Sequence, residues 1–226
     1  MRRVSALAHT SVGKKVLMAV TGFIWFGFLV GHMAGNLKAF TGAEHFDEYA
    51  HHLRVFGEPM VPPMGFLWTF RLLVLVAFVG HVILAWQTSR GSHAARQVAY
   101  RKQEHLSFSR ASGFMRWGGV AILVFVIFHL LHMTTGQLHP DFVEGAAYAN
   151  LVGGLSSPVV AGLYVLAMVA VSAHLYHGLW SLFQTVGAAH PKYHAARRPL
   201  AVAAALVIFF GFISIPVAVL TGVLTF

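Results

Sequence analysis

Cysteine is absent from this sequence and charged residues are scarce. The 226 residues include no Cys, and only 10% are Asp, Glu, Lys or Arg, whereas soluble domains carry about 25% charged residues. The absence of thiols excludes disulfides, thiolate zinc sites, cysteine-ligated iron–sulfur clusters and a cysteine nucleophile. The shortage of charge excludes a surface made for water, so we expect lipid to surround most of the chain.

Five apolar segments are each about as long as a membrane-spanning helix. They run over residues 16–37, 66–88, 114–136, 159–184 and 200–224, and roughly 20 residues cross the core of a bilayer. The first follows two basic pairs, as in a signal peptide, but it is too long and has no small-residue cleavage site, so we expect it to be retained. The sequence predicts an all-α membrane protein with five transmembrane helices in one domain, residues 1–226.

Basic and acidic residues lie at opposite ends of these predicted helices. If the five helices alternate in direction, 13 of the 16 Lys and Arg fall on the side of the N-terminus, and six of the seven acids fall on the other side. Loops rich in Lys and Arg stay in the cytoplasm. We therefore expect a multi-pass protein of a bacterial or archaeal cytoplasmic membrane, with the N-terminus inside and the C-terminus outside. The same bias explains the net charge of +9 without nucleic acid.

The predicted outer loop, residues 38–65, contains a helical pattern of its own. Its apolar residues recur at helical spacing, which predicts a short amphipathic helix at the outer interface: Phe46, Tyr49, Leu53 and Phe56. Five polar residues are then expected to face water: Glu44, Asp47, Glu48, His51 and His52. Prolines end the pattern at Pro59, Pro62 and Pro63. The inner loop, residues 89–112, is polar and basic, and is either a solvated connection or a docking segment.

Four successive apolar segments each carry a histidine at depth: His32, His81, His129 and His174. A helix rises about 1.5 Å per residue, which puts the first and third roughly 22–25 Å from the cytoplasmic side. The second and fourth lie roughly 22 Å from the outer side by the same rise. The sequence therefore predicts an outer pair, His32 with His129, and an inner pair, His81 with His174.

Paired histidines on facing helices are typical of haem ligands. A histidine in hydrocarbon needs partners for its ring nitrogens, and a single one is often only an interhelical contact. Four on four helices predict more, because helical bundles hold cofactors with side chains from facing helices. We expect two haem b groups, one at each level, whose irons carry electrons and do not bind oxygen because both axial positions are filled. In the alternative, a structural anchor, the histidines only pack.

Other polar and small residues near these positions allow two interpretations each. His132 and His177 lie three residues after His129 and His174, and this spacing does not choose the ligand within either doublet. Neighbouring glycines either permit close helix packing or leave room for a flat macrocycle: Gly27, Gly31, Gly35, Gly80 and Gly178. Arg71 either neutralises a propionate of the outer haem or extends its side chain to the interface. A histidine-rich metal transporter is disfavoured, because the five segments contain no Asp or Glu.

Four stretches form a specific combination: SVGKKVLMAVTG, GHMAGNL, RWGGVAILVFVIFHLLHMTTG and HLYHGLWSLFQTVG. Together they resemble the single-chain, five-helix, di-haem cytochrome b subunit of succinate:quinone oxidoreductases and fumarate reductases, over essentially the whole chain. The resemblance implies one haem held by the first and third helices and one by the second and fourth. It implies His129 and His174 as the ligands within the doublets. His132 and His177 then become partners of a ligand or of a propionate.

The resemblance also implies partners and a quinone. The family works beside a flavoprotein that oxidises succinate and an iron–sulfur protein. This chain has no cysteine and no dinucleotide-binding glycine motif. We therefore expect no catalytic residue in it. We expect the chain to bind both subunits at its cytoplasmic face. It would pass electrons to or from a quinone, usually menaquinone, and the inner haem would receive them first.

The position of the quinone and the role of Glu58 each have more than one interpretation. Family members bind quinone near the outer haem, the inner haem or both. Glu58, at the end of the outer loop, is either a proton relay for an outer quinone or an exposed loop acid. The alternative function is a di-haem cytochrome b subunit of a hydrogenase or formate dehydrogenase, which would bind the same haems and different partners.

Overall fold

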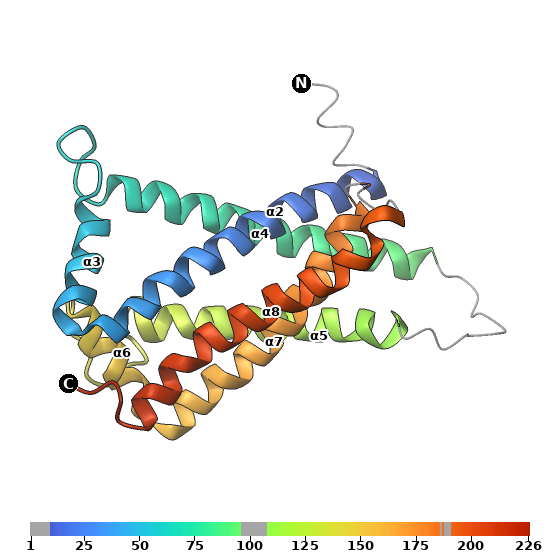
Figure 1. Cartoon of the computed structure of the whole chain (residues 1–226). Coiled ribbons are helices and arrows are strands. Elements are labelled where there is room, and N and C mark those ends of the chain that lie inside the picture. Colours follow the sequence, from blue (N-terminus) through green and yellow to red (C-terminus); the bar gives the residue numbers. More distant parts are fainter. Residues whose placement is uncertain (1–9, 96–107, 186, 188–190) are drawn as a thin grey trace.

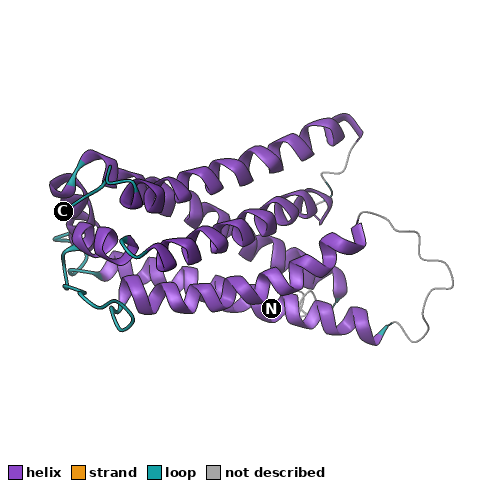
Figure 2. Cartoon of the chain, turned by 90° about the horizontal axis from the view of Figure 1, so that it is seen from below, coloured by secondary structure: helices purple, strands orange, loops and turns teal. Residues whose placement is uncertain are grey.

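The computed structural model describes residues 10–95, 108–185, 187 and 191–226. These residues form helices joined by turns and loops, and no strand occurs among them (Figures 1 and 2). Five helices are long and apolar enough to cross a membrane. They are α2 (Ser11–Leu37), α4 (Gly65–Ala94), α5 (Phe108–His129), α7 (Pro158–Thr185) and α8 (Pro191–Leu220). The predicted fold class and the number of spanning helices are thus confirmed.

The helices extend beyond the apolar segments at one end of the bundle. α2 starts at residue 11 and not 16, α4 continues to 94, and α8 starts at 191 and not 200. Backbone hydrogen bonds need no apolar side chains, so a helix that has formed continues into polar sequence. Thr10 stops α2 there, because its side-chain oxygen accepts a hydrogen bond from the N–H of Gly13 at 3.0 Å.

Two helices end earlier than the apolar segments predict. α5 ends at His129 and passes into a π-helical turn, η2 (Leu130–Thr134). α8 ends at Leu220, because Gly222 adopts a φ of +75°. This left-handed conformation is open to glycine and lets the N–H of Val223 bond back to the carbonyl of Ala218 at 2.8 Å.

The five long helices form an antiparallel bundle. α2 packs on α4 and α8, and α7 packs on α5 and α8. Figure 1 shows α2 beginning at the end of the molecule opposite the C-terminus, and α4 ends and α5 begins at that same end. Two further helices, α3 (Ala43–Val55) and α6 (Ala147–Leu155), lie at the end that holds the C-terminus.

This second end is closed by a buried apolar cluster, which we call the end cap. The turn after α2, α3, α6, the end of α8 and the C-terminal turn contribute to it: Ala39, Phe46, Tyr148, Val152, Leu155, Ile215, Ala218, Val219 and Leu224. Two hydrogen bonds tie it together. The N–H of Tyr148 donates to Asp47 Oδ1 at 2.8 Å, and the hydroxyl of Tyr148 donates to the carbonyl of Thr225 at 3.1 Å.

The amphipathic helix predicted in the outer loop is present as α3, with two corrections. Phe46 is buried as expected, and α3 ends at Val55, before the prolines. Phe56, expected on the apolar face, instead follows the helix in an extended conformation and is 46% exposed. Asp47, however, does not simply face water: its carboxylate binds the first turn of α6, where a helix leaves backbone N–H groups without partners. The sequence did not predict α6, and it therefore did not predict that Asp47 would bind the N-terminal turn of this helix.

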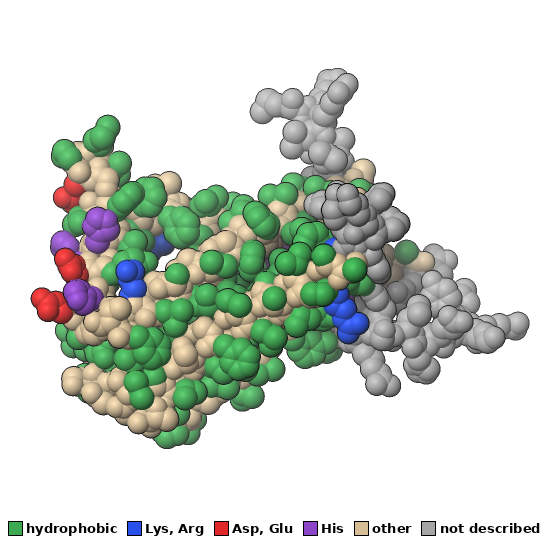
Figure 3. Space-filling model, in the orientation of Figure 1, with side chains coloured by type: hydrophobic (Ala, Val, Ile, Leu, Met, Phe, Trp, Pro, Cys, Tyr) green, Lys and Arg blue, Asp and Glu red, His purple; other side chains and the backbone are tan. Residues whose placement is uncertain are grey.

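The outside of the bundle is apolar along its length and polar at its ends. Large apolar side chains are exposed on several helices, including Val76 (69%), Leu166 (69%) and Phe210 (60%). Figure 3 shows this apolar surface between an acidic and histidine-rich end, at α3, and an opposite end where Lys and Arg gather. Such a surface fits a lipid solvent with water at both ends.

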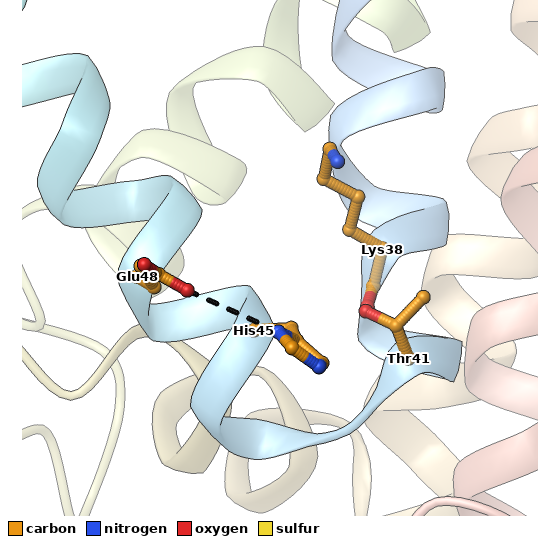
Figure 4. A network of polar contacts seen from close by, with 4 residues as sticks. All are labelled: Lys38, Thr41, His45 and Glu48. Carbon is orange, nitrogen blue, oxygen red and sulfur yellow. Dashed lines mark hydrogen bonds and ion pairs between the residues drawn. The ribbon is translucent and has the colours of Figure 1, made fainter.

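The polar face of α3 carries exposed groups with weak contacts. His45 Nδ1 lies 3.9 Å from Glu48 Oε2, and both side chains are well exposed. Figure 4 shows this pair on α3, with Lys38 and Thr41 on the neighbouring turn η1 (Lys38–Thr41). The hydroxyl of Thr41 donates to the carbonyl of Lys38 at 2.7 Å. Exposed pairs of this kind contribute little to stability, so this face is a solvated surface.

Close packing of α2 on α8 depends on Gly211. A Cβ atom at Gly211 would overlap the thioether of Met33, which is buried, whereas a Cβ at Gly162 would meet nothing within 4 Å. We expect Gly211→Val to lower the free energy of unfolding by about 1–3 kcal/mol, the usual range for overpacking. Gly162→Val is the matched control and should change it much less. Thermal unfolding in detergent measures both; equal effects of the two variants would contradict the packing argument.

Candidate functional site

The outer pair of histidines meets inside the bundle. His32, near the end of α2, and His129, the last residue of α5, have ring centroids 5.8 Å apart and nearly perpendicular ring planes. Aromatic rings surround His32: Phe28 stacks on it at 5.2 Å, and Phe212 of α8 lies at 5.8 Å. The two ligands predicted for one level therefore come together from different helices, in apolar surroundings.

The inner pair also meets. His81 of α4 and His174 of α7 have ring centroids 6.3 Å apart. His81 Nδ1 lies 3.1 Å from the carbonyl oxygen of Met18, and 3.2 Å from the hydroxyl of Thr21. A carbonyl only accepts, so Nδ1 carries the hydrogen and donates it. The lone pair of His81 is then on Nε2, as a metal ligand requires.

His174 supplies a further sign of a missing partner. Its Nδ1 is buried and has no hydrogen-bond partner among the described residues. Buried polar atoms without partners are uncommon in folded proteins and call for an explanation. A buried ring that faces another imidazole and lacks a protein partner of its own fits a ligand to a metal.

Both separations fit a six-coordinate metal between the rings. A metal–nitrogen bond is about 2 Å long, and the ring centre lies about 1 Å beyond the nitrogen, so two rings on opposite sides of one metal have centres about 6 Å apart. The observed centroid distances are 5.8 and 6.3 Å. Two neutral imidazoles are also the donor set of low-spin haem iron. The residues present therefore fit a haem at each level.

The second member of each doublet points elsewhere. His132 is 2% exposed and stacks on His139 at 5.2 Å, and His177 lies 6.0 Å from Trp180. His132 does not stand where His129 stands, opposite His32 of another helix. The geometry thus pairs the residues that the sequence prediction paired, while the binding of haem by these rings stays a prediction.

Tyr164 of α7 is a polar contact of the outer pair that sequence reasoning missed. Its hydroxyl lies 3.2 Å from His129 Nδ1 and 3.0 Å from His132 Nδ1. The available signal was a phenol inside an apolar helix, since a buried tyrosine hydroxyl usually finds a partner. Which residue it would meet depends on how α5 and α7 pack.

His139, also missed, lies in the loop before α6. Its Nδ1 accepts from the N–H of Asp141 at 3.1 Å, and its Nε2 lies 3.0 Å from the carbonyl of Asn150. The Asn150 side chain in turn bridges to the backbone of Val143, at 2.9 and 2.6 Å. This network fixes the ring that stacks on His132.

The glycines named from the sequence serve different purposes. A Cβ at Gly27, Gly31 or Gly178 would meet no atom of the described residues within 4 Å, so none of their side chains fills the space beside these glycines. Gly35, by contrast, lies against the Tyr49 hydroxyl, where a Cβ would approach to 2.8 Å, so it permits α2 and α3 to pack closely. Gly22 and Gly119, which the sequence did not indicate, approach the inner histidines: a Cβ at Gly22 would lie 3.2 Å from His81 Cε1, and one at Gly119 3.8 Å from His174 Cε1.

Arg71 and Glu58 lie away from the paired rings. Arg71 is exposed, and its guanidinium lies 5.1 Å over the ring of Trp68 on the same helix, α4. This arrangement favours extension toward the interface over contact with a buried propionate. Glu58 is exposed in the turn after α3. Its role at a quinone stays a prediction.

No group of three or more His, Cys, Asp or Glu that could hold a free metal ion occurs among the residues that the structure describes. The histidines come together in pairs. A pair suits an axial position on each side of a metal that carries its own equatorial ligands, as haem iron does.

Comparison with known proteins agrees with this geometry. The family model described as succinate dehydrogenase/fumarate reductase transmembrane subunit matches residues 100–214, which include His129 and His174. The succinate dehydrogenase cytochrome b558 subunit of Bacillus subtilis (strain 168) is 27% identical over 160 residues, which are 71% of this chain and 72% of that protein. No solved structure matches the chain. The family model covers half of the chain, and the chain therefore belongs to the family of succinate dehydrogenase/fumarate reductase transmembrane subunits.

Proposed function

We propose that this subunit is a di-haem cytochrome b that carries electrons between an iron–sulfur subunit and membrane quinone. One observation carries the proposal: two pairs of imidazole rings, each pair from different helices, face each other at 5.8 and 6.3 Å. The outer pair is His32 with His129 and the inner pair is His81 with His174. The name of the Bacillus subtilis relative, a cytochrome b558 subunit, supports haem b as the cofactor.

The protein's own residues hold, orient and shield these sites. Bound between two imidazoles, haem iron supplies one-electron transfer and leaves no position for oxygen. The Met18 carbonyl fixes the tautomer and the orientation of His81. Phe28 and Phe125 lie against His32 and His129 at 5.2 and 5.8 Å, so aromatic rings cover part of the outer pair and make its surroundings apolar. Low polarity around a bound haem is one of the ways a protein sets its potential.

Charge supports one orientation and one docking face. Exposed Lys15, Arg90 and Arg198 lie toward the start of α2, the end of α4 and the start of α8. These helix ends lie together at the end of the bundle opposite the C-terminus (Figure 1). Loops with this charge stay in the cytoplasm, which puts α3, α6 and the C-terminus outside. The flavoprotein and iron–sulfur subunits would dock at the basic face, and the inner pair would receive electrons first.

The absence of cysteine defines the division of work in the complex. A chain with no Cys cannot ligate an iron–sulfur cluster through thiolates, so dicarboxylate chemistry and cluster transfer belong to the partner subunits. This chain anchors them and exchanges electrons with quinone, which we take to be menaquinone as the resemblance implies. Glu58 is the proposed proton relay if quinone binds at the outer side. The family match favours this complex over a hydrogenase or formate dehydrogenase.

Removal of one inner ligand should remove one haem. His81→Ala or His174→Ala leaves the opposite imidazole without a partner across the metal, while the outer rings belong to other residues. We expect the purified complex to fall from two haem b per chain to one, measured by haem extraction and reduced-minus-oxidised spectra. Succinate:quinone activity should fall with it. A wild-type complex without haem b would refute the proposal outright.

The doublet on α5 provides a sharper test of the assignment. His132 packs on His139 and does not face His32, so His132→Ala should retain two haems. His129→Ala, the matched variant three residues earlier, should lose the outer haem and keep the inner one. The opposite result would show that His132 is the ligand.

The orientation can be tested with single cysteines, because the native chain has none. Glu48→Cys lies on exposed α3 at the proposed outer end, and Ser92→Cys lies in the last turns of α4 at the basic end. We expect an impermeant maleimide to label the first in intact cells and the second only after permeabilisation. Labelling in the reverse pattern would invert the topology.

A further inference from the structure

The Tyr164 hydroxyl lies between the rings of His129 and His132. It lies 3.2 Å from His129 Nδ1 and 3.0 Å from His132 Nδ1. Two aromatic rings fix its own ring: Phe125 meets it edge-on at 5.2 Å, and Phe128 lies at 6.0 Å. The phenol oxygen is therefore held where it contacts both imidazoles at once.

Counting hydrogens restricts how this trio can bond. A hydroxyl has one hydrogen to donate and lone pairs with which to accept. Tyr164 can donate to only one of the two Nδ1 atoms and must accept from the other for both bonds to form. Of the two neutral rings, one then carries its hydrogen on Nδ1 and one on Nε2. The network has a direction, and the direction decides which histidine presents a free Nε2 lone pair.

Packing fixes the position of the His132 ring. Its ring stacks at 5.2 Å, nearly parallel, on His139, and a Cβ at Gly154 would come within 2.9 Å of His132 Cε1. His139 cannot give way, because the Asp141 N–H donates to its Nδ1 and its Nε2–H must donate to the Asn150 carbonyl. His132 is thus held away from His32.

His129 is then the ring that donates to the hydroxyl. Its ring faces His32 at 5.8 Å, and an Nε2 lone pair available toward His32 requires the hydrogen on Nδ1. The chain of bonds runs from His129 Nδ1–H to the Tyr164 oxygen, and from the Tyr164 O–H to His132 Nδ1. The π-helical turn η2 begins directly after His129 and contains His132. Such turns are frequent at functional sites.

We propose that Tyr164 is a positioning residue that selects His129 as the outer ligand. By the same contact it lowers the midpoint potential of the haem that His129 would hold. This proposal rests on the proposed di-haem function. Donation from Nδ1–H makes an imidazole a more basic ligand, which favours ferric over ferrous iron. The bond from the Tyr164 hydroxyl to His132 polarises the phenol oxygen and strengthens the effect. At the inner pair, His81 Nδ1 lies 3.1 Å from the backbone carbonyl of Met18 and 3.2 Å from the Thr21 hydroxyl, and no substitution of one side chain removes the carbonyl acceptor.

The test is Tyr164→Phe in the purified complex, which removes the hydroxyl and keeps the ring. We expect two haems per chain, with the outer-haem potential raised by about 59 mV, equal to a tenfold change in the one-electron equilibrium, and the inner-haem potential unchanged. Redox titration followed by absorbance measures both, and electron paramagnetic resonance of the ferric haems should change only for the outer one. The same substitution in a His81→Ala background assigns the step to the outer haem.

A matched control is Tyr148→Phe, which removes another hydroxyl at the same end of the bundle, one that donates to the Thr225 carbonyl and to no histidine. It should move neither potential. His132→Ala, which leaves the Tyr164 hydrogen without its acceptor, should raise the outer potential by less than Tyr164→Phe. If Tyr164→Phe loses the outer haem, the outer-haem potential of His132→Ala is the measurement that tests the proposal.

Two kinds of failure can be told apart. The role of Tyr164 is overturned if the outer-haem potential is unchanged in haem-loaded Tyr164→Phe. If Tyr164→Phe loses the outer haem, an unchanged potential in His132→Ala overturns it instead. Either result leaves the two-haem assignment standing. A wild-type complex without haem b, or two haems retained in His129→Ala, overturns the proposed function, and this inference with it.

Discussion

A histidine ring inside hydrocarbon needs partners for both of its nitrogens, and this requirement explains much of the interior of the bundle. Each of the four deep histidines faces another across helices, at 5.8 or 6.3 Å. Local contacts serve Nδ1 on at least two of the rings, from the Met18 carbonyl or the Tyr164 hydroxyl. For His81 and His129, Nε2 is then the nitrogen that still needs a partner, which the proposed haem iron would supply.

The two levels differ in how they are supported. The inner pair relies on the backbone of α2, and Gly22 allows that backbone to approach His81 closely. The outer pair lies beside the end cap, where loop, α6 and α7 bring three polar side chains together: Tyr164, His139 and Asn150. A backbone acceptor is fixed by the fold, whereas a side-chain network can be changed by single substitutions. Of the two proposed haems, the outer one is therefore the one whose potential a single side-chain substitution should change more readily.

The polar ends of the bundle have separate tasks. At one end, Asp47 and Tyr148 bind backbone groups of neighbouring segments and hold α3, α6 and the C-terminal turn together. At the other, Lys and Arg gather where α2 and α8 begin and α4 ends. The first arrangement closes the bundle near the outer pair, and the second provides the charged face that a membrane anchor needs for orientation and for soluble partners.

The sequence by itself determined the all-α class, the five spanning segments, the α3 helix and the pairing levels of His32, His81, His129 and His174, because helical periodicity, span length and depth follow from residue order and rise per residue. Family membership, too, was visible in its motifs. Tertiary structure alone decided that Asp47 caps α6, that His132 stacks on His139, and that Tyr164 lies between two imidazoles. These contacts join residues from different helices, and which faces meet depends on how helices rotate and pack, which local spacing does not specify.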